Sequence, residues 1–440
     1  MRISMIGCGY LGAVHAASMA EIGHDVVGID VDEGRISALA AGTAPFFEPG
    51  FEEVLSRNVA SGRLRFTTDI SAARGAQVHF IGVGTPQTPS GAADMTYVDS
   101  AVEALVPHLG HCQEGEEIVV GKSTVPVGTA ARLAERFDAA GTTLVWNPEF
   151  LREGFAVKDT LEPDRMVYGL PIDPARAEAA AAVLDEVYAP ILATGVKRLT
   201  MDYATAELVK VSANSFLAIK ISFINAVAQV CDAASADVTA LAEAIGLDAR
   251  IGHRFLRAGI GFGGGCLPKD IRAFQARAGE LGVGDALAFL AEVDRVNDTM
   301  RAGVIRTVRE LLGEHTSAAT VTVLGAAFKP DSDDMRNSPA LDLAVELSGM
   351  VERVVVHDPA AGPILAKRTN RPYEVAASAQ SALEGTDLVI IGTEWREYRD
   401  LDPAQAAGLV RTCYVIDGRN CLDAQAWKAA GWSYRGIGRR

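Results

Sequence analysis

The stretch RISMIGCGYLG, residues 2–12, decides the fold of the first part of this 440-residue chain. Its apolar beginning predicts a strand, and its glycines follow the pattern G-x-G-x-x-G before a helical stretch of small residues that runs to Ile22. A second apolar run, Val26 to Ile29, ends on the acid Asp30, 18 positions after Gly12. This order predicts a dinucleotide site in a doubly wound α/β sheet: a strand, the glycine pattern, a helix, a second strand and an acid.

Each glycine of this pattern has a separate expected task. The first makes the turn, the second admits the pyrophosphate, and the third lets helix and strand pack closely. Asp30 is expected to bind the adenosine ribose and to repel a 2′-phosphate, which favours NAD over NADP, although Arg35 could also meet such a phosphate. Cys8 fills an x position and is interpreted as a small packing residue. The predicted cofactor loop consists of Gly7, Gly9, Tyr10, Leu11 and Gly12.

The composition is that of a globular enzyme of two or three domains. Hydrophobic residues make up 49% and charged residues 22% of the chain, and the formal net charge is −15. That charge argues against nucleic acid or an anionic membrane as the main partner, and we expect no uninterrupted apolar run long enough to cross a bilayer. The N-terminus predicts a strand, not a signal peptide. Six cysteines show neither disulfide nor zinc spacing, so we expect no metal and a reducing cytoplasm.

Up to about residue 195, apolar runs alternate with helical stretches, as in a doubly wound sheet. Three further runs, at 78–83, 118–120 and 144–146, each end in polar or turn residues. These ends are Thr85-Pro86, Lys122-Ser123-Thr124 and Asn147-Pro148-Glu149. One such end is usually an ordinary turn, but the carboxyl ends of parallel strands share the edge where ligands bind. Three of them therefore predict a ligand crevice at this edge.

The middle part of the chain is expected to be helical. From Asp202, a good N-cap residue, the run 203–233 contains neither glycine nor proline and predicts one long helix that crosses between domains. Lys210 and Asn214 are spaced i, i+4 and therefore share one face of it. A largely buried face must give both side chains partners, which favours a functional role over a lysine that merely reaches solvent.

A cysteine stands in a glycine-rich loop, GFGGGCLPKD at residues 261–270. Pro268 suits the first turn of a helix that continues to Leu281 and stops at Gly282. Cys266 then lies just before a helix N-terminus, whose positive end favours a thiolate, and the glycines let backbone N–H groups approach a substrate. This pattern indicates a nucleophilic thiol; the alternative is a buried cysteine in a tight turn.

The last part, from about residue 306, contains a second strand followed by a glycine, VTVLG at 321–325. Its further expected elements are a helix at 340–347 and strands at 354–358, 388–391 and 415–417. This second α/β unit lacks the full glycine pattern, so we expect it to bind a ligand other than a dinucleotide. Lys329 and Arg419 follow strand ends, where they could hold a diphosphate, unless they are solvated surface charges.

Together these segments resemble the UDP-glucose 6-dehydrogenases, within the UDP-glucose/GDP-mannose dehydrogenase family, over nearly the whole chain. The segments that carry the resemblance are Gly7 to Gly12, KSTVPV at 122–127, NPEFLREG at 147–154, Lys210 with Asn214, Gly263 to Asp270, Phe328-Lys329 and DGRN at 417–420. The resemblance implies two Rossmann-like domains joined by a long helix that also forms dimers. The implied domains are an NAD-binding domain at 1–195, a helical dimerisation domain at 196–305 and a UDP-sugar domain at 306–440.

The resemblance also assigns roles residue by residue. It implies that Cys266 is the nucleophile and that Glu149 serves thioester hydrolysis. The other implied catalytic residues are Lys210, Asn214 and Asp270, around the sugar C6 and a water, and Thr124. The further implied cofactor contacts are Asp30, Arg35, Thr85, Thr124, Glu153, Lys269 and Arg336. The implied substrate contacts are Glu149, Phe150, Leu151, Glu153, Lys210, Asn214, Phe255, Leu256, Arg257, Ala258, Gly259, Gly263, Lys329, Arg419 and, toward a neighbouring subunit, Arg250.

The implied activity is NAD-dependent oxidation of UDP-glucose at C6 to UDP-glucuronate, which removes two hydrides through a thiohemiacetal and a thioester on Cys266.

Two positions depart from the UDP-glucose branch: Gly265 stands where many relatives carry Ser, and Leu267 is common in GDP-mannose enzymes. The segments 163–165 and 436–439 favour UDP-glucose. GDP-mannose and UDP-N-acetylhexosamines stay as alternative substrates, beside two other classes of protein, a two-electron hydroxy-acid dehydrogenase and a non-catalytic NAD-binding protein.

Overall fold

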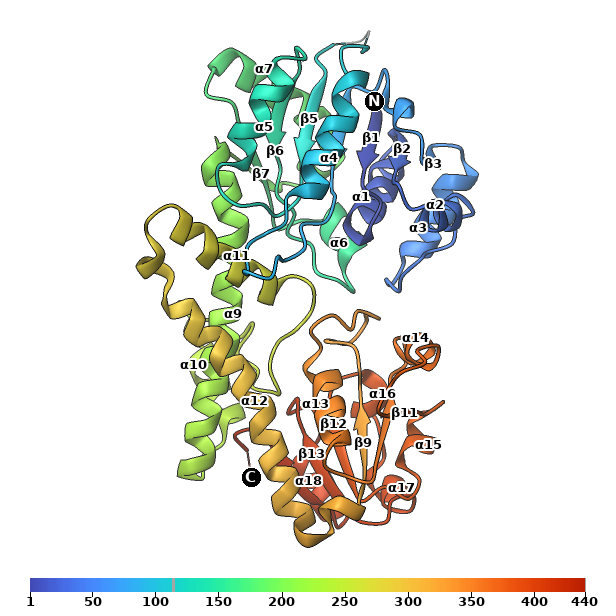
Figure 1. Cartoon of the computed structure of the whole chain (residues 1–440), viewed down its shortest axis with the longest axis vertical. Helices are drawn as coiled ribbons and strands as arrows, with labels where there is room; N and C mark the ends of the chain where they lie inside the picture. The colour runs from blue at the N-terminus through green and yellow to red at the C-terminus, as the bar shows by residue number, and fades with distance from the viewer. Residues whose placement is uncertain (113–114, 440) are drawn as a thin grey trace. The chain divides into compact units, whose positions relative to one another are not determined.

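The computed structural model describes residues 1–112 and 115–439, and these form two compact units (Figure 1). The first unit consists of Met1–Ala213 and Ala273–Gly284, and the second of Asn214–Arg272 and the chain from Asp285 onward. Each unit has its own sheet and its own apolar core. The three-domain division at residues 195 and 305 stays a prediction, and its last residue, Arg440, lies outside the described chain.

The first unit is built on an eight-stranded sheet in the order β3-β2-β1-β4-β5-β6-β7-β8. Its strands are β1 (Arg2–Ile6), β2 (Asp25–Ile29), β3 (Leu64–Thr67), β4 (Val78–Ile81), β5 (Ile118–Gly121), β6 (Thr143–Trp146), β7 (Arg165–Leu170) and β8 (Lys197–Asp202). All neighbours are parallel except β6 and β7, which are antiparallel. The order of the first six strands confirms the predicted doubly wound fold, and it reverses between β1 and β4, where such sheets bind ligands.

Alternate residues of these strands enter different apolar cores. Val26 and Phe80 lie in one buried cluster, whereas their neighbours Val27 and Ile81 lie in another. Both faces of the sheet are therefore covered, which explains why its central strands are apolar at nearly every position. The α-helices that lie wholly in this unit are α1 (Tyr10–Glu21), α2 (Glu33–Ala40), α3 (Phe51–Ala60), α4 (Thr96–Leu105), α5 (Thr129–Asp138), α6 (Ala156–Leu161), α7 (Pro174–Val187) and α8 (Ala189–Leu192).

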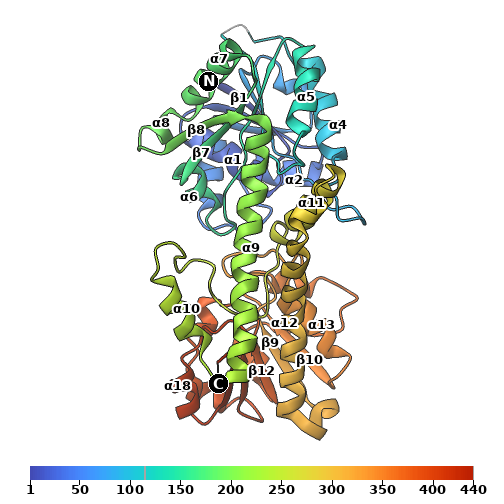
Figure 2. The same cartoon turned by 90° about the vertical axis from the view of Figure 1, so that its left-hand side faces the viewer.

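One helix, α9 (Tyr203–Ala234), runs for 32 residues through the stretch predicted at 203–233, and Figure 2 shows it as one continuous helix. The Asp202 carboxylate accepts a 2.8 Å hydrogen bond from Thr205 N, which confirms the predicted N-cap. By length and composition alone α9 could cross a membrane, and 33% of its 18-residue apolar segment is buried within the protein. Charged side chains such as Lys210 and Lys220 interrupt the apolar residues of α9, so this helix does not contradict the expectation that the chain has no uninterrupted apolar run of that length.

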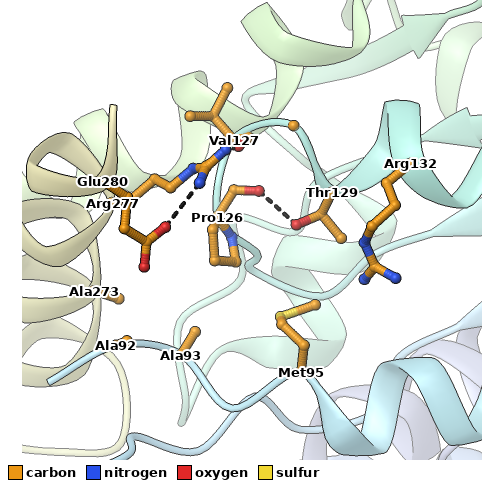
Figure 3. Close-up of a pocket in the computed structure, with 11 residues that line it drawn as sticks. Ala92, Ala93, Met95, Pro126, Val127, Thr129, Arg132, Ala273, Arg277 and Glu280 are labelled. Carbon is orange, nitrogen blue, oxygen red and sulfur yellow. Dashed lines mark hydrogen bonds and ion pairs between the residues drawn. The ribbon is translucent and has the colours of Figure 1, made fainter. Parts of the chain in front are cut away.

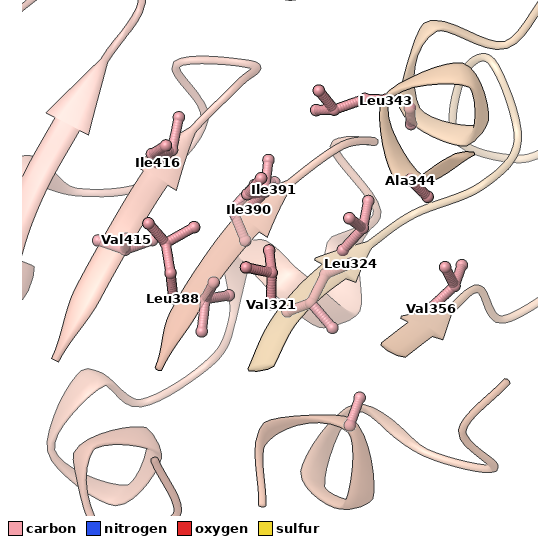
Figure 4. Close-up of a cluster of buried hydrophobic side chains, with 14 of the residues drawn as sticks. Val321, Leu324, Leu343, Ala344, Val356, Leu388, Ile390, Ile391, Val415 and Ile416 are labelled. Carbon is pink, nitrogen blue, oxygen red and sulfur yellow. The ribbon is translucent and has the colours of Figure 1, made fainter. Parts of the chain in front are cut away.

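The second unit repeats the doubly wound plan with a parallel sheet in the order β11-β10-β9-β12-β13-β14. Its strands are β9 (Thr320–Leu324), β10 (Arg353–His357), β11 (Glu374–Val375), β12 (Leu388–Ile391), β13 (Tyr414–Asp417) and β14 (Ser433–Gly436). Val321, Ile390 and Ile416 belong to its buried core (Figure 4). The second α/β unit predicted from the sequence is thus confirmed.

The helices of the second unit complete this plan. They are α10 (Val238–Gly246), the first turns of α11 (Leu267–Glu280), α12 (Phe289–Leu312), α13 (Pro339–Ser348), α14 (Gly362–Ala366), α15 (Ala379–Leu383), α16 (Arg396–Arg399), α17 (Pro403–Ala407) and α18 (Ala424–Ala429). Helix α13 begins where the sequence predicts one, because the Ser338 hydroxyl caps it and Pro339 fills its first position.

The acid that follows β10 distinguishes the second unit from the first. Asp358 has the place after β10 that Asp30 has after β2. Its buried carboxylate accepts hydrogen bonds of 2.8–3.1 Å from the backbone N–H groups of Ala326, Ala327, Ala360 and Ala361 and from the Trp395 indole. Both oxygens of this carboxylate are therefore engaged by groups of the second unit itself. Asp358 thus holds the loops at the end of β10 together, and a ligand other than a dinucleotide stays the prediction for this unit.

Candidate active site

The glycine loop between β1 and α1 has the shape that NAD needs. A Cβ added at Gly12 would lie 1.8 Å from the Gly7 carbonyl oxygen, so this glycine is required for helix–strand packing. A Cβ added at Gly9 would meet nothing within 4 Å, and Gly9 is the N-cap of α1 without a side-chain cap. The helix N-terminus thus presents backbone N–H groups at an open position, which fits a pyrophosphate.

Asp30 and Arg35, the two residues expected to choose between NAD and NADP, form an ion pair. Asp30 Oδ2 accepts a hydrogen bond from Cys8 N at 2.7 Å, and Arg35 Nη1 lies 3.0 Å from the same oxygen. Arg35 also pairs with Asp32 at 3.3 Å. The carboxylates of Asp30 and Asp32 therefore neutralise the positive charge of Arg35, which a 2′-phosphate of NADP would need as its partner. Cys8 is fully buried, and burial raises the pKa of its thiol, which confirms it as a packing residue.

We expect kcat/KM to favour NAD over NADP by at least about tenfold, or roughly 1.4 kcal/mol, because Asp30 repels a 2′-phosphate and Arg35 is already paired. Asp30→Ala should narrow this ratio, since it removes the repulsion and releases Arg35. Steady-state kinetics with both cofactors on the two proteins checks this. Equal kcat/KM values for the wild type would show that Arg35 decides the preference instead.

The three polar strand ends of the first unit meet, as predicted. The Thr85 hydroxyl donates to the Thr124 carbonyl oxygen at 2.8 Å, which ties the end of β4 to that of β5. The Lys122 ammonium donates to Asn147 Oδ1 at 2.9 Å and lies 3.6 Å from Glu149 Oε2, which ties β5 to β6. The cofactor and catalytic residues predicted at these ends therefore share one edge of the sheet.

Phe150 and Leu151, two of the predicted substrate contacts, directly follow Glu149. Leu151 N donates to Glu149 Oε1 at 2.5 Å, so the chain turns tightly here. The ring of Phe150 lies beside two cations, with its centroid 3.9 Å from the Arg165 guanidinium and 5.4 Å from Lys210 Nζ. The structure thus brings Lys210, a predicted catalytic residue, next to a predicted substrate residue within the first unit.

A carboxylate far away in the sequence holds the backbone next to Glu153, a predicted cofactor contact. Glu48 is buried and accepts hydrogen bonds from Gly154 N at 2.6 Å and Ala156 N at 2.7 Å, and the Tyr10 hydroxyl also donates to it. Glu48 thereby caps the start of α6 and ties it to the start of α1. Sequence reasoning missed Glu48, because the contact joins residues 106 positions apart.

Cys266, the predicted nucleophile of the second unit, directly precedes a helix. Helix α11 begins at Leu267, and Asp270 N donates to the Cys266 carbonyl oxygen at 2.9 Å. The Cys266 side chain is exposed, so the alternative of a buried turn cysteine is wrong. A Cβ added at Gly265 would lie 2.4 Å from the Arg336 guanidinium carbon. A serine at position 265 would therefore require the flexible end of the Arg336 side chain to move.

Three of the predicted polar residues gather beside this loop. Asn214 Nδ2 donates to Asp270 Oδ2 at 2.6 Å, and Lys269 Nζ lies 2.7 Å from Asp270 Oδ1. Asp270 is 2% and Asn214 is 8% exposed, so the network is nearly closed to solvent. Lys269 was predicted as a cofactor contact, and the structure places its ammonium on the Asp270 carboxylate instead of leaving it in solvent.

The predicted sugar-nucleotide loop, residues 255–263, is held by side chains from three other segments. These bonds join Gly259 N to Asn225 Oδ1 at 2.9 Å, Phe262 N and O to the Asn297 amide at 2.7 and 3.0 Å, and Gly261 O to Arg419 Nη1 at 2.9 Å. Phe255 has a φ of 66°, a left-handed conformation that is strained for an aromatic residue. Leu256, Ala258, Gly259 and Gly263 are buried, whereas Arg257 is exposed.

The remaining predicted cations differ in their surroundings. The Arg419 side chain is 12% exposed and burial lowers the pKa of its guanidinium, so the alternative of a solvated surface charge is wrong for it. Lys329 Nζ lies 5.4 Å from the Phe328 ring centroid, and Arg336 is bidentate to Asp334. Arg250 is 89% exposed and pairs with Asp248. The contacts of Lys329, Arg336 and Arg250 with ligands or a neighbouring subunit stay predictions.

A pocket of about 270 Å³ opens in the first unit between the start of α5 and α11 (Figure 3). Its walls include Met95, Pro126, Arg132, Arg277 and Glu280. None of the predicted catalytic, cofactor or substrate residues lines it. The residues predicted to carry the chemistry lie instead at the strand ends of the first unit and around Cys266 in the second.

Comparison with known proteins assigns the family. The profiles of the NAD binding domain, the central domain and the UDP binding domain of one family match residues 1–192, 204–299 and 322–424. The chain belongs to the UDP-glucose/GDP-mannose dehydrogenase family. Its family membership confirms the resemblance stated from the sequence motifs, and the matched domain confirms NAD as the cofactor.

Relatives within the family are similar over their whole length. The chain is 40% identical over 446 residues to a UDP-glucose 6-dehydrogenase of Rhizobium meliloti, with both chains fully covered. It is 38% identical over 444 residues to UDP-glucose 6-dehydrogenase TuaD of Bacillus subtilis, covering 100% of this chain and 93% of the relative. A solved UDP-glucose dehydrogenase of Pyrobaculum islandicum matches with a TM-score of 0.89 at 38% identity, covering 100% and 98%. The protein is thus an NAD-dependent oxidoreductase, and its membership of this family excludes the hydroxy-acid dehydrogenase and non-catalytic alternatives.

Proposed function

We propose that this dehydrogenase oxidises the C6 alcohol of UDP-glucose to the carboxylate of UDP-glucuronate through a covalent intermediate on Cys266. The observation that carries the proposal is the exposed thiol directly before α11, with the Asn214–Asp270 pair beside the same loop. Such a thiol gives a second oxidation a covalent route, which an enzyme that stops at the aldehyde does not need. Full-length relatives named UDP-glucose 6-dehydrogenase favour UDP-glucose over the alternative sugars.

The chain's own residues supply the proton and acyl chemistry. NAD, bound twice in succession, would supply one hydride acceptor for each of the two oxidations. Asp270 or Glu149, through a water, takes the proton of the C6 hydroxyl as the aldehyde forms. The Cys266 thiolate then adds to the aldehyde carbon, and Lys210 and Asn214 stabilise the oxyanion that this addition creates. The second oxidation leaves C6 as a thioester of Cys266.

Hydrolysis of the thioester completes the reaction. Glu149 orients a water and takes its proton, the water oxygen bonds to the acyl carbon, and the C–S bond breaks so that Cys266 leaves as a thiolate. The Leu151 N–H, 2.5 Å from Glu149 Oε1, fixes one side of the carboxylate for this task. Because Cys266 must stay a thiol, we place the reaction in the reducing cytoplasm.

The number of NADH molecules formed per sugar tests this proposal. With excess NAD and limiting UDP-glucose, the purified protein should form two NADH per sugar consumed and release UDP-glucuronate, identified by mass spectrometry. GDP-mannose and a UDP-N-acetylhexosamine are assayed in parallel, and a higher kcat/KM with either would move the substrate assignment to that sugar. One NADH per sugar, with aldehyde released, would contradict the thioester route.

We also propose that α9 forms a homodimer with a second copy of the chain. Phe216, Phe223 and Val230 are 61%, 53% and 65% exposed, although they are large and apolar. They are spaced by seven residues and therefore form one stripe along α9. A contiguous exposed apolar stripe is typical of a protein interface, and a helix can cover the same stripe of its own copy.

Phe223→Glu should convert the dimer into a monomer, because a charge at the centre of this stripe would be buried without a partner. Light scattering after gel filtration measures the mass in solution. Ile172→Glu is the matched control, since Ile172 is 94% exposed and lies outside α9, and it should leave the mass unchanged. A wild-type protein with the mass of one chain would contradict the dimer.

A further inference from the structure

We propose that Lys122 is a positioning residue for Glu149, and that its ammonium group holds the Glu149 carboxylate in the orientation that thioester hydrolysis requires. The inference rests on the proposed function, in which Glu149 directs the water. Lys122 lies in the first unit directly after β5, and it is 4% exposed. A lysine at such a place is costly to bury unless its charge has partners.

The ammonium group has few polar neighbours. Lys122 Nζ donates to Asn147 Oδ1 at 2.9 Å and lies 3.5 Å from the Tyr188 hydroxyl and 3.6 Å from Glu149 Oε2. The rings of Phe80 and Tyr188 face it, with centroids at 5.7 and 5.9 Å. Burial lowers the pKa of Lys122, and the nearby Glu149 carboxylate opposes this shift. Glu149 is therefore the negative partner that favours the charged lysine.

The sheet fixes the direction of the lysine side chain. Gly121 pairs with Trp146 at the end of the β5–β6 ladder, so Lys122 and Asn147 are the next pair along it. Asn147 is locked in place, because its N–H donates to Gly121 O at 2.8 Å and its Nδ2 donates to Val167 O at 2.9 Å. Asn147 lies two residues before Glu149 in the sequence. Its Oδ1 accepts the hydrogen bond from Lys122 Nζ and so fixes the ammonium group near Glu149.

Lys122 is not needed to satisfy Asn147. The Tyr188 hydroxyl already donates to Asn147 Oδ1 at 2.8 Å, so this buried oxygen keeps a partner without the lysine. Other titratable groups packed in this cluster include Tyr188, Tyr168, whose ring centroid lies 6.4 Å from that of Tyr188, and His15, whose ring packs against Phe80 and Tyr188. Burial raises the pKa of Tyr188 and lowers that of His15, so both stay neutral. The charges that face each other in this cluster are those of Lys122 and Glu149.

The Glu149 carboxylate is held at both oxygens. Oε1 accepts the Leu151 N–H at 2.5 Å, and Oε2 faces Lys122 at 3.6 Å. Without the ammonium group, Oε2 loses its cation and the carboxylate can turn, because the terminal torsion of a glutamate is broad. A misplacement of about 1 Å in a group that orients a reactant can cost about 100-fold in rate. Lys122 therefore bears on the hydrolytic step through Glu149.

Two variants remove the charge in different ways. Lys122→Met keeps the apolar length of the side chain, and Lys122→Gln keeps a hydrogen-bond donor for Asn147. If one variant does not fold, the hydrolysis rate can still be measured on the other. In both we expect a normal first burst of NADH, slower thioester hydrolysis by about 10- to 100-fold, and a UDP-sugar adduct on Cys266 in intact-protein mass spectra. The KM for UDP-glucose should stay within about twofold of the wild type, since ground-state binding is unchanged.

Tyr188→Phe is the matched control, because it disturbs the same buried cluster without touching Glu149. It should lower stability yet leave the hydrolysis rate within about twofold of the wild type. A double-mutant cycle with Glu149→Gln completes the test. If Lys122 acts through Glu149, Lys122→Met adds little further slowing to Glu149→Gln.

Wild-type hydrolysis in the Lys122 variants, or slowing that is additive with Glu149→Gln, would overturn the proposal. A Tyr188→Phe protein that hydrolyses the thioester as slowly as Lys122→Met would also overturn it, because general damage to the cluster would then explain both. A Glu149→Gln protein that hydrolyses the thioester at the wild-type rate would be a different result. It would contradict the proposed role of Glu149 in hydrolysis, and Lys122 would then have no catalytic carboxylate to position.

Discussion

Cys266→Ala should reduce the formation of UDP-glucuronate by about 10³-fold or more, because the second oxidation loses its nucleophile. The thiol is exposed directly before α11, so alanine removes the sulfur without changing the packing of the loop. The first oxidation will also look weak, since it is reversible and the aldehyde stays bound. Mixed with NAD and UDP-glucose, the Cys266→Ala protein should carry no adduct in an intact-protein mass spectrum, whereas Glu149→Gln should accumulate one after its burst of NADH.

Cys413→Ala is the matched control for this experiment. Cys413 is a partly buried thiol of the same unit, outside every predicted site segment, and its removal should leave activity and adduct unchanged. Equal unfolding temperatures would show that Cys266→Ala folds normally. An adduct on the Cys266→Ala protein would mean that another residue is the nucleophile, and unaltered hydrolysis in Glu149→Gln would shift the activation of water to Asp270 and Lys210.

Gly12→Val should weaken NAD binding by about 100-fold or more and also lower the unfolding temperature of the protein. The added Cβ would lie 1.8 Å from the Gly7 carbonyl oxygen and 2.9 Å from the Met5 methyl group. A backbone oxygen in the tight turn directly after β1 cannot move aside as the end of a flexible side chain can. The valine therefore separates α1 from β1 and displaces the helix N-terminus that should hold the pyrophosphate.

Gly9→Ala separates packing from binding within the same loop. Its Cβ would meet nothing within 4 Å of the protein, and its φ of −64° suits any residue. We therefore expect a normal unfolding temperature with weakened NAD binding, because the methyl group takes the space of the pyrophosphate. Calorimetric titration with NAD and thermal unfolding measure the two effects. Normal NAD affinity in Gly12→Val, or a large loss of stability in Gly9→Ala, would contradict these separate roles.

The central strands could be predicted because they are buried on both faces, so they are apolar at most positions. Strands β1, β4 and β5 are of this kind. The edge strands gave no such signal: β8 reads KRLTMD and is exposed at nearly every residue, and β11 has only two residues. The antiparallel pairing of β6 with β7 could not be predicted either, since strand direction depends on the partner and not on the local pattern.

The candidate site divides in the same way. Cys266 and the glycines of the two loops have local signatures, because a turn, a helix start and a close approach all depend on neighbouring residues. The buried links do not, since Lys122 meets Asn147 across 25 positions and Glu48 meets Gly154 across 106. One weak signal pointed toward Lys122: a lysine that directly follows the fully buried strand β5 is placed to be buried itself. Its partners became known only with the fold.

The route of the chain through the two units has a consequence for synthesis on the ribosome. The first unit takes its last piece from Ala273–Gly284, and Arg277 in that piece donates to Val127 O at 2.9 Å. The first unit therefore cannot be completed until residue 284 has left the exit tunnel, after all of α9 and the Cys266 loop. A protein with contiguous domains can finish its N-terminal domain much earlier. Here a nascent chain that stops before residue 273 leaves the start of α5 without its partner, and is a natural client for chaperones.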